Sequence, residues 1–434
     1  MKLRVPDYYE EFACIADRCK DSCCIGWEID IDEDSYEYYK EIPGEIGARL
    51  QTSMILTEDM EHSFRLVEHG RCPFLNDRNL CDLCIELGEE ALCEVCTEYP
   101  RFSLEYGEIL QKTLSLSCEE VGRILFSKEE PVSFVERSLG ECEELEEFGE
   151  CEELGEFGEC EVFEDFEECD TFCEEPEEDW DYIAFCEEVQ EKLIAVLQDR
   201  SQSIWQRMRT YLHILQQIQT LINEDPEQEW QGISVSEIAK GQGISVNEIA
   251  KGQGISVSEI AKGQECDKEG AVGSNFRNLQ DEDAFSLFFA RFSAFCQMET
   301  LDVEWENQKE ALRERFTKER YQGLLEDFLR SDCYLEKDYE HLMVYFTFRY
   351  FMNCVYDYDM LSYGKLVVGF TLMIRDMDAL RFTEKEGRYD SLDRIDVARI
   401  FSKEVEHSLE NVELAKEEFM FGEEFSIEKL CAQI

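Results

Sequence analysis

Apolar residues recur at helical spacing along much of the chain after residue 180. Between 180 and 223 they fall on one helix face, which predicts a connecting helix that packs against a folded part of the protein. The positions that carry this spacing are Ile183, Val189, Leu193, Val196 and Leu197. Apolar stretches at 285–295, 321–330 and 363–380 predict further amphipathic or buried helices. Alternation typical of β-strands is scarce, so we expect a mainly α fold.

The longest apolar run extends from Leu342 to Val355 and contains Arg349. It is shorter than the roughly 20 residues that a membrane-spanning helix needs, and its central charge would be costly in lipid. The run therefore predicts a buried helix, and we expect no membrane association. The first residues are acidic and aromatic and contain no apolar stretch of signal-peptide length, which favours a cytoplasmic protein.

Two repeated segments interrupt these patterns, and the first is strongly acidic. A nine-residue unit beginning GECEELEEF recurs from residue 140, and residues 140–179 hold 21 Asp or Glu and no Lys or Arg. This density of like charge with few aliphatic residues predicts a disordered insert. Because the repeat cysteines are nine residues apart, successive ones would point to opposite sides of a helix or strand. They are therefore poorly placed to bind one ion together. A loose metal-buffering segment is the alternative.

The second repeat is an eleven-residue unit that occurs three times between 232 and 264, twice as GISVSEIAKGQ and once as GISVNEIAKGQ. Ser234 and Glu237 form a capping-box pattern, and Gly241 can end the short helix that this pattern opens. The unit is similar to the start of a helix-turn-helix motif, but no basic recognition helix follows it. We interpret the three units as an expanded linker rather than as a solenoid or a DNA-binding element.

These patterns divide the 434 residues into five parts. We expect a cysteine-rich cluster-binding region at 1–126, a disordered acidic insert at 127–179, a connecting helix at 180–223, a repeat linker at 224–280 and a helical domain at 281–434. The predicted fold class is mainly α, with a cysteine-rich N-terminal metal-binding region and a helical C-terminal domain separated by low-complexity repeat inserts.

Composition narrows the possible functions. The 42 Lys and Arg against 101 Asp and Glu give a formal net charge of −59, so no overall field attracts nucleic acid or an anionic membrane. The 21 cysteines are an odd number in a long chain, unlike the cysteines of a small secreted disulfide scaffold. Their abundance therefore indicates metal or redox chemistry.

The cysteines of the first 126 residues form two groups. Cys14, Cys19, Cys23 and Cys24 are close enough in sequence for their thiolates to surround one soft ion or an iron–sulfur cluster. The second group contains two Cys-x-x-Cys pairs with a gap that is short for a zinc ribbon. Its members are Cys72, Cys81, Cys84, Cys93, Cys96 and Cys118. Buried, reduced thiols are the alternative, but many sequence neighbours are charged, which disfavours a purely apolar role.

Several short motifs in the N-terminal and C-terminal parts of the chain occur in a characteristic order and spacing. The N-terminal motifs are Val5-Pro-Asp-Tyr8, Phe12-x-Cys14, Cys19-x3-Cys23-Cys24-x-Gly26-Trp27, Cys72-Pro-Phe-Leu75, Leu80-Cys81, Leu87-Gly88-Glu89, Cys96-x2-Tyr99-Pro100-Arg101 and Leu114-Ser-Leu-Ser-Cys118. The C-terminal motifs are Val344-Tyr345-Phe346, Arg349-Tyr350-Phe351 and Ser402-Lys-Glu404-Val-Glu406-His407-Ser408 with Asn411. Together they resemble the flagellin lysine N-methylases over roughly residues 1–126 and 280–415.

The resemblance implies a [4Fe-4S] cluster and methyl transfer from S-adenosyl-L-methionine to lysine side chains of flagellin. The cysteines on motif positions are Cys14, Cys19, Cys23, Cys24, Cys72, Cys81, Cys96 and Cys118, whereas Cys84 and Cys93 look like additions in this chain. A cubane takes up to four thiolates, so some of the eight must have another role. Cys19, Cys23, Cys81 and Cys96 are the first candidates for ligands.

Methyl transfer to lysine sets requirements that these motifs can meet. The donor is a sulfonium cation and the acceptor is an ammonium whose ordinary pKa is about 10.4, so the site must attract positive charge and accept a proton. The catalytic candidates are Tyr345, Glu404, Glu406 and His407, and the cofactor-binding candidates are Arg349 and Asn411. A core aromatic stripe, a solvated acidic helix face and a salt-bridged histidine are the structural alternatives.

No motif shows where the methyl donor binds. The sequence has no Gly-x-Gly-x-x-Gly turn after a strand and no Cys-x3-Cys-x2-Cys motif of the radical type, since Cys24 directly follows Cys23. We predict an iron–sulfur-dependent protein lysine methyltransferase that acts on flagellin in the cytoplasm. The alternatives are a non-enzymatic zinc- or iron-binding or electron-transfer module, and an interaction protein whose acidic insert binds a basic partner.

Overall fold

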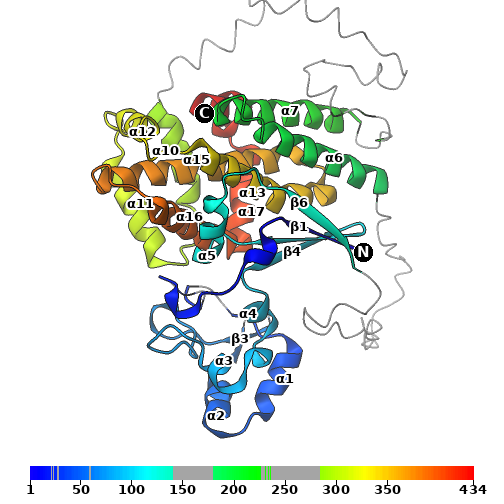
Figure 1. The fold of residues 1–434 in the computed structure, drawn as a ribbon, viewed down its shortest axis with the longest axis vertical. Helices are drawn as coiled ribbons and strands as arrows, with labels where there is room; N and C mark the ends of the chain where they lie inside the picture. Colours follow the sequence, from blue (N-terminus) through cyan, green and yellow to red (C-terminus); the bar gives the residue numbers. More distant parts are fainter. Residues whose placement is uncertain are drawn as a thin grey trace, which may run out of the picture.

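A computed structural model describes residues 1–139, 179–225 and 284–434, except 21, 23, 27, 28, 58 and 59, together with 230, 233 and 235. In this part of the chain a large helical body carries a smaller lobe at one end (Figure 1). We name the smaller part, residues 24–98, the cysteine lobe. The mainly helical fold expected from the sequence is confirmed. Most of the acidic insert and of the repeat linker lies outside the described residues.

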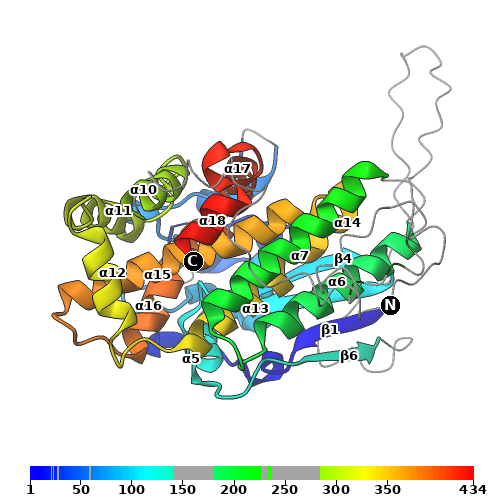
Figure 2. The ribbon, with the colours of Figure 1, turned by 90° about the horizontal axis from the view of Figure 1, so that it is seen from above.

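A four-stranded sheet lies along one side of the helical body, next to α6 and α13 (Figure 2). Its strands are β1 (Lys2–Pro6), β4 (Arg101–Tyr106), β5 (Ile109–Leu114) and β6 (Phe134–Ser138), in the order β4-β5-β1-β6. β1 and β5 are parallel, and the other two pairs are antiparallel. Sequence patterns missed this sheet because the strands are short and only β5 alternates in burial. β6 lies in the segment expected to be a disordered insert.

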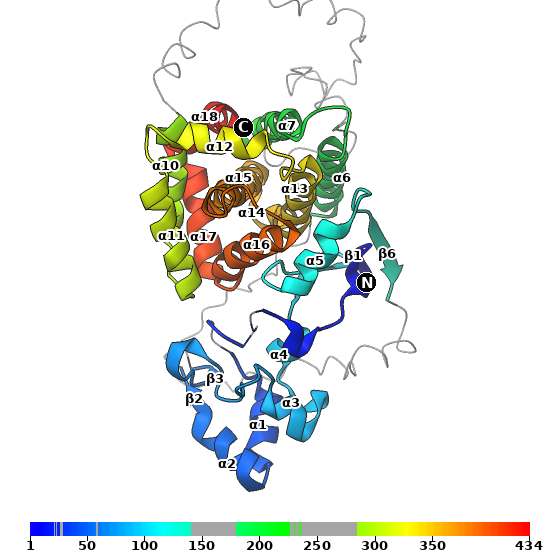
Figure 3. The same cartoon turned by 60° about the vertical axis from the view of Figure 1, so that its left-hand side comes forward.

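The helices of the body surround α15, which extends from Met360 to Glu384 (Figure 3). Every residue of α15 from Met360 to Leu380 is buried except Leu361, because α7, α12, α13, α16 and α17 pack around it. The other helices of the body are α5 (Glu119–Ser127), α6 (Trp180–Leu197), α7 (Ile204–Glu224), α10 (Ala284–Phe295), α11 (Val303–Arg315), α12 (Tyr321–Leu329), α13 (Glu336–Tyr350), α14 (Cys354–Asp357), α16 (Ser391–Glu406), α17 (Leu409–Phe421) and α18 (Ile427–Gln433).

The segment expected to form one connecting helix contains two helices, α6 and α7. The chain turns between them at 198–203, where Asp199 accepts hydrogen bonds from the backbone and side chain of Ser201. Ser203 then caps α7 through a capping box with Gln206. Apolar periodicity continues on both sides of the turn, which explains why the break is not visible in the hydrophobic pattern.

Charged residues are buried within the helical body and are paired there. Asp378 on α15 forms an ion pair with Arg394 of α16 and accepts a 2.7 Å hydrogen bond from Tyr339 of α13. Burial raises the pKa of Asp378 to about 6, although Arg394 acts in the opposite direction. These contacts stabilise the packing of α13, α15 and α16 against one another, because a buried charge without a partner is strongly destabilising.

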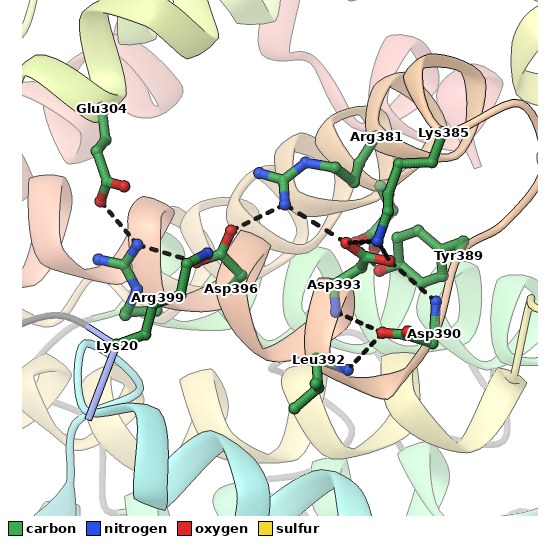
Figure 4. A network of polar contacts seen from close by, with 11 residues as sticks. Lys20, Glu304, Arg381, Lys385, Tyr389, Asp390, Leu392, Asp393, Asp396 and Arg399 are labelled. Atoms are coloured by element: carbon green, nitrogen blue, oxygen red, sulfur yellow. Dashed lines mark hydrogen bonds and ion pairs between the residues drawn. The ribbon is translucent and has the colours of Figure 1, made fainter. Parts of the chain in front are cut away.

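An ion-pair network fixes the N-terminal loop to α16 (Figure 4). Asp396 lies 2.8 Å from Lys20, 2.8 Å from Arg381 and 3.0 Å from Arg399. Burial alone would raise the pKa of Asp396, but these cations hold it well below its ordinary value. Because Lys20 directly follows Cys19, the network places the loop of Cys14 and Cys19 against the helical body.

The cysteine lobe has an apolar core of its own. Its elements are α1 (Glu33–Glu41), α2 (Gly44–Ser53), β2 (Met54–Leu56), β3 (His62–Phe64), α3 (Asp82–Leu87) and α4 (Glu94–Glu98). Tyr39, Leu50, Phe64 and Phe74 are buried at its centre.

In the described part of the chain, no helix combines the length and apolar character needed to cross a membrane.

His341 of α13 generates a prediction about acid stability. Its side chain is 0% exposed, and burial lowers its pKa from 6.5 to about 4. Between these values the unfolded chain binds a proton that the folded chain does not, so the free energy of unfolding falls as the pH falls. We expect His341→Gln to remove this contribution, about 3 kcal/mol between pH 7 and 4, in urea denaturation. The exposed control His213→Gln keeps the wild-type slope, and equal slopes for both variants would contradict the account.

Candidate active site

Glu406, the last residue of α16, is a buried carboxylate surrounded by hydroxyl groups. Tyr345 donates to its Oε2 at 2.7 Å and to its Oε1 at 2.9 Å, and Ser115 donates to Oε2 at 2.7 Å. Burial raises the pKa of Glu406, whereas Arg349 and the hydroxyl donors act to lower it, and the net direction is upward. Segments 61 and 291 residues away in sequence therefore meet at this carboxylate.

Hydrogen bonds continue from Glu406 toward the surface of the helical body. The Oγ atoms of Ser115 and Ser117 are 2.6 Å apart. Ser117 Oγ lies 2.9 Å from Nε2 of His407 and 3.0 Å from the hydroxyl of Tyr99. The rings of Tyr99 and His407 also pack edge to face, with centroids 5.7 Å apart. We name this set the polar chain: Tyr345, Glu406, Ser115, Ser117, His407 and Tyr99.

The motif Leu-Ser-Leu-Ser-Cys forms the turn that presents the two serines. Strand β5 ends at Leu114, and the backbone N–H of Ser115 donates to Pro100 O at 2.7 Å. Leu116 N–H donates to the Tyr345 hydroxyl at 3.2 Å, and Cys118 stands at the N-cap position of α5. The short turn thereby directs both serine hydroxyls toward α13 and α16.

Aromatic groups and one cation surround the buried end of the polar chain. The guanidinium carbon of Arg349 lies 3.5 Å from the ring centroid of Phe102 and 5.3 Å from that of Tyr350. Burial raises the pKa of Tyr345, Tyr350 and Tyr8, and the nearby Glu406 charge raises each further. These phenols therefore stay protonated and cannot act as bases, and the Tyr345 hydroxyl donates to Glu406.

Glu404 and Asn411, two other predicted site residues, lie in a different contact. Glu404 accepts hydrogen bonds from the backbone N–H groups of Leu301 at 3.1 Å and Asp302 at 3.2 Å. Asn411 donates to the carbonyl groups of Glu299 and Glu404, both at 3.0 Å. The structure does not bring these two side chains to the polar chain. Both instead form hydrogen bonds with the loop at 299–302, just before α11.

The cysteine lobe meets the helical body at this same loop. Gly26 has φ +91°, and a Cβ atom there would lie 3.3 Å from Asp302 Oδ2 and 3.4 Å from Lys403 Cε. Lys403 donates to Asp302 Oδ2 at 2.8 Å. Glycine is favoured at 26 for both conformation and close approach, which explains its place in the Cys-Cys-x-Gly motif.

Five cysteine thiols gather in the core of the cysteine lobe. Burial raises the pKa of Cys72 to about 12, and three neighbouring thiols add to the rise. A side-chain hydrogen bond joins Cys93 and Cys96, lowering the pKa of Cys93 and raising that of Cys96. We name the set the thiol cluster: Cys24, Cys72, Cys81, Cys93 and Cys96. Cys93, which the sequence motifs set aside as an addition, is one of its buried members.

Of the other N-terminal cysteines, Cys84 lies on α3 of the cysteine lobe, whereas Cys14, Cys19 and Cys118 lie outside the lobe. Cys14 is exposed, and its charge raises the pKa of both Cys84 and Cys118, after the larger effect of burial. Cys19 is half-buried beside Lys20. Cys23 lies outside the described residues.

The described residues do not form a ready-made metal site. Among them, no group of three or more His, Cys, Asp or Glu side chains converges closely enough to hold a metal ion. The thiols of the thiol cluster are the right donors for an iron–sulfur cluster, yet their present arrangement does not fit one directly.

Sequence reasoning assigned no role to Ser115, Ser117 or Tyr99. All three lie within the family-like motifs at 96–101 and 114–118, but serine and tyrosine side chains are uncharged and are not typical metal ligands. Their role is visible only once β5, α13 and α16 are placed side by side, because the partners are far apart in sequence.

Comparisons with known proteins identify relatives of the chain. A family model described as the FliB lysine N-methylase C-terminal domain matches residues 190–433. The flagellar biosynthetic protein FliU of Salmonella muenchen is 31% identical over 126 residues, which are 28% of this chain and 75% of that protein. The lysine-N-methylase of Salmonella typhimurium is 27% identical over 139 residues, 31% of this chain and 35% of that protein. The match thus spans about a third of this methylase, and no solved structure matches the chain.

Glu404 generates a prediction about stability at neutral pH. Burial raises its pKa from 4.5 to about 7, so between these values the folded chain holds a proton that the unfolded chain releases. The stability contributed by this group is present below pH 4.5 and is lost as the pH rises through 7. We expect Glu404→Gln to remove a decline of about 3 kcal/mol in the free energy of unfolding across this window. The exposed control Glu410→Gln keeps the decline. A pH-independent difference between Glu404→Gln and the wild type would contradict the assignment.

Proposed function

The chain belongs to the FliB lysine N-methylase family, and we propose that it uses S-adenosylmethionine to methylate lysine side chains of flagellin. The observation that carries the proposal is the polar chain. It joins the Leu-Ser-Leu-Ser-Cys motif, the aromatic helix α13 and the end of α16 through hydrogen bonds of 2.6–3.0 Å. These are the motifs that resemble the family, and they meet around one buried carboxylate.

Lysine methylation requires the loss of one proton for each methyl group accepted. A lysine ammonium is protonated at neutral pH and becomes nucleophilic only as the neutral amine. We assign proton acceptance to the polar chain, with the half-buried His407 at its outer end and Glu406 at its buried end. Tyr345 and Ser115 orient the carboxylate by donating hydrogen bonds to it.

Charge also supports a reaction between two cations. Both the sulfonium donor and the lysine substrate are positively charged, so a negatively charged surrounding favours their approach. The formal net charge of −59 gives the whole chain this character and disfavours nucleic acid as a partner. Flagellin methylated in the cytoplasm before export is the substrate in this proposal.

The thiol cluster is proposed as the site of the [4Fe-4S] cluster. A cubane needs up to four thiolates, and the thiol cluster offers five soft donors. Its support is that Cys72 and Cys93 are buried in the apolar core of the cysteine lobe and that Cys24, Cys81 and Cys96 pack against the same core. Because the described thiols do not converge on one point, no step of methyl transfer is assigned to the cluster.

A second function has one observation in its favour. The cysteine lobe has an apolar core separate from that of the helical body, so it has the organisation of an independent metal-binding module. In this alternative the lobe holds zinc or iron for structural or electron-transfer purposes, and the chain does not methylate protein.

Substitution of Glu406 tests the proposed function. Glu406→Gln retains the side-chain shape but cannot carry a negative charge or accept a proton. We expect the methylation rate of purified flagellin with S-adenosylmethionine to fall at least about 100-fold, measured by mass spectrometry of lysine residues. The control Glu410→Gln, an exposed carboxylate of α17, keeps the wild-type rate. Wild-type activity in Glu406→Gln would remove Glu406 from the site, and an inactive wild type would favour the metal-module alternative.

Metal content tests the proposed role of the thiol cluster. After anaerobic purification we expect about four iron and four sulfide per wild-type chain, with absorbance near 400 nm. Cys72→Ser and Cys93→Ser should lose most of the iron, whereas Cys333→Ser in the helical body should retain it. Zinc without iron would support the structural module, and unchanged iron in both thiol-cluster variants would exclude these thiols as ligands.

A further inference from the structure

The polar chain has one buried end and one end near the surface. Glu406 is 3% exposed, and Ser115 and Ser117 are 0% and 6% exposed. His407 and Tyr99 at the other end are half-buried. In the described part of the chain, two serine hydroxyls thus connect the buried carboxylate to the imidazole through hydrogen bonds.

The direction of each hydrogen bond follows from the number of hydrogen atoms available. An ionised carboxylate only accepts, so the single hydroxyl hydrogen of Ser115 points at Glu406. The 2.6 Å contact between the serines then requires Ser117 to donate to Ser115. With its own hydrogen committed, Ser117 must accept from Nε2–H of His407. This assigns the Nε2–H tautomer to a neutral His407, with the basic lone pair on Nδ1.

We propose that the polar chain is a proton relay, in which Ser115 and Ser117 carry the proton of the substrate lysine from His407 to Glu406. All hydroxyl hydrogens already point toward Glu406, and the three links measure 2.9, 2.6 and 2.7 Å. The inference rests on the proposed lysine methylation and specifies which residues of the site move the proton.

The relay balances for each methyl transfer. The lysine ammonium gives a proton to Nδ1 of His407, whose Nε2 proton passes to Ser117. Ser117 passes its hydroxyl proton to Ser115, and Ser115 passes its own to Glu406. The neutral amine then attacks the methyl carbon of the donor, forming an N–C bond while the S–C bond breaks and its electron pair stays on sulfur. The proton returns along the same hydroxyls to solvent after the product leaves.

The surroundings of the two ends support this direction of transfer. Burial disfavours the charged form of Glu406 and raises its pKa, so the carboxylate is a ready proton acceptor. The groups that face it are Tyr345, Tyr350, Tyr8 and Arg349. At the other end His407 is half-buried and its Nδ1 is shielded from solvent, so a substrate lysine must displace the groups that cover Nδ1 and lose its own hydration, which favours the neutral amine.

Substitution of Ser117 tests the relay directly. Ser117→Ala removes the central hydroxyl, and we expect the single-turnover methylation rate to fall at least about tenfold. Binding of S-adenosylmethionine and the melting temperature should stay near wild type, and Ser117→Thr should recover most of the rate. Ser103→Ala, an exposed hydroxyl on β4, is the matched control and keeps full activity.

Chemical rescue separates a relay from a structural role. Imidazole added to His407→Ala should restore methylation, because it can pass a proton to Ser117. It should fail to rescue the double variant His407→Ala with Ser117→Ala. Equal rescue of both variants, or a wild-type rate in Ser117→Ala, would overturn the relay and leave the proposed methylation standing. An inactive wild-type protein would instead refute the proposed function itself.

Discussion

A buried carboxylate needs hydrogen-bond donors around it, and the organisation of the site depends on meeting this need at Glu406. An ionised group without partners would be strongly destabilising, so the fold must bring hydroxyl groups to it. Tyr345 arrives on α13, and Ser115 arrives on the turn after β5. The antiparallel pairing of β4 with β5 extends to Leu114, and the Ser115 N–H donates to Pro100 O just before β4, which holds that turn in place. The sheet, although small, therefore determines whether the polar chain can form.

Residues within the cysteine lobe and on either side of it contact the helical body. Tyr99 follows Cys96 by three residues and contacts both Ser117 and His407. Lys20 pairs with Asp396, and Gly26 packs against Asp302 and Lys403. The lobe thus has its own core but shares its boundary with the polar chain. Cys96 of the thiol cluster is three positions before Tyr99 at the outer end of the polar chain, so a group bound by the thiol cluster is attached close in sequence to that end.

The sequence was sufficient for the mainly helical character of the fold. Apolar periodicity predicted helices at 180–223, 285–295, 321–330, 342–355 and 363–380, but not α5, α11, α16, α17 or α18. The site residues taken from the motifs stay predictions, although the structure places Tyr345, Glu406, His407 and Arg349 near one another. The sheet was not predictable from pattern, since its strands are short and β6 is largely exposed. Glu404 and Glu406 are two residues apart on α16, so their side chains point to opposite sides of the helix and have different partners. The motif alone does not show which of the two sides faces Tyr345 and Ser115, because those partners are far away in sequence. Cys93 was set aside because it is not on a motif position, and its proximity to Cys72 depends on the fold of the lobe.

The central claim is that the polar chain is the place where a lysine side chain is deprotonated and methylated. A crystal structure with S-adenosylhomocysteine and a lysine peptide of flagellin tests it most directly. The account predicts that the lysine nitrogen lies within hydrogen-bond distance of His407, with the sulfur of the cofactor on its other side. A lysine bound away from Tyr99, His407 and Ser117, with the polar chain undisturbed, would contradict it.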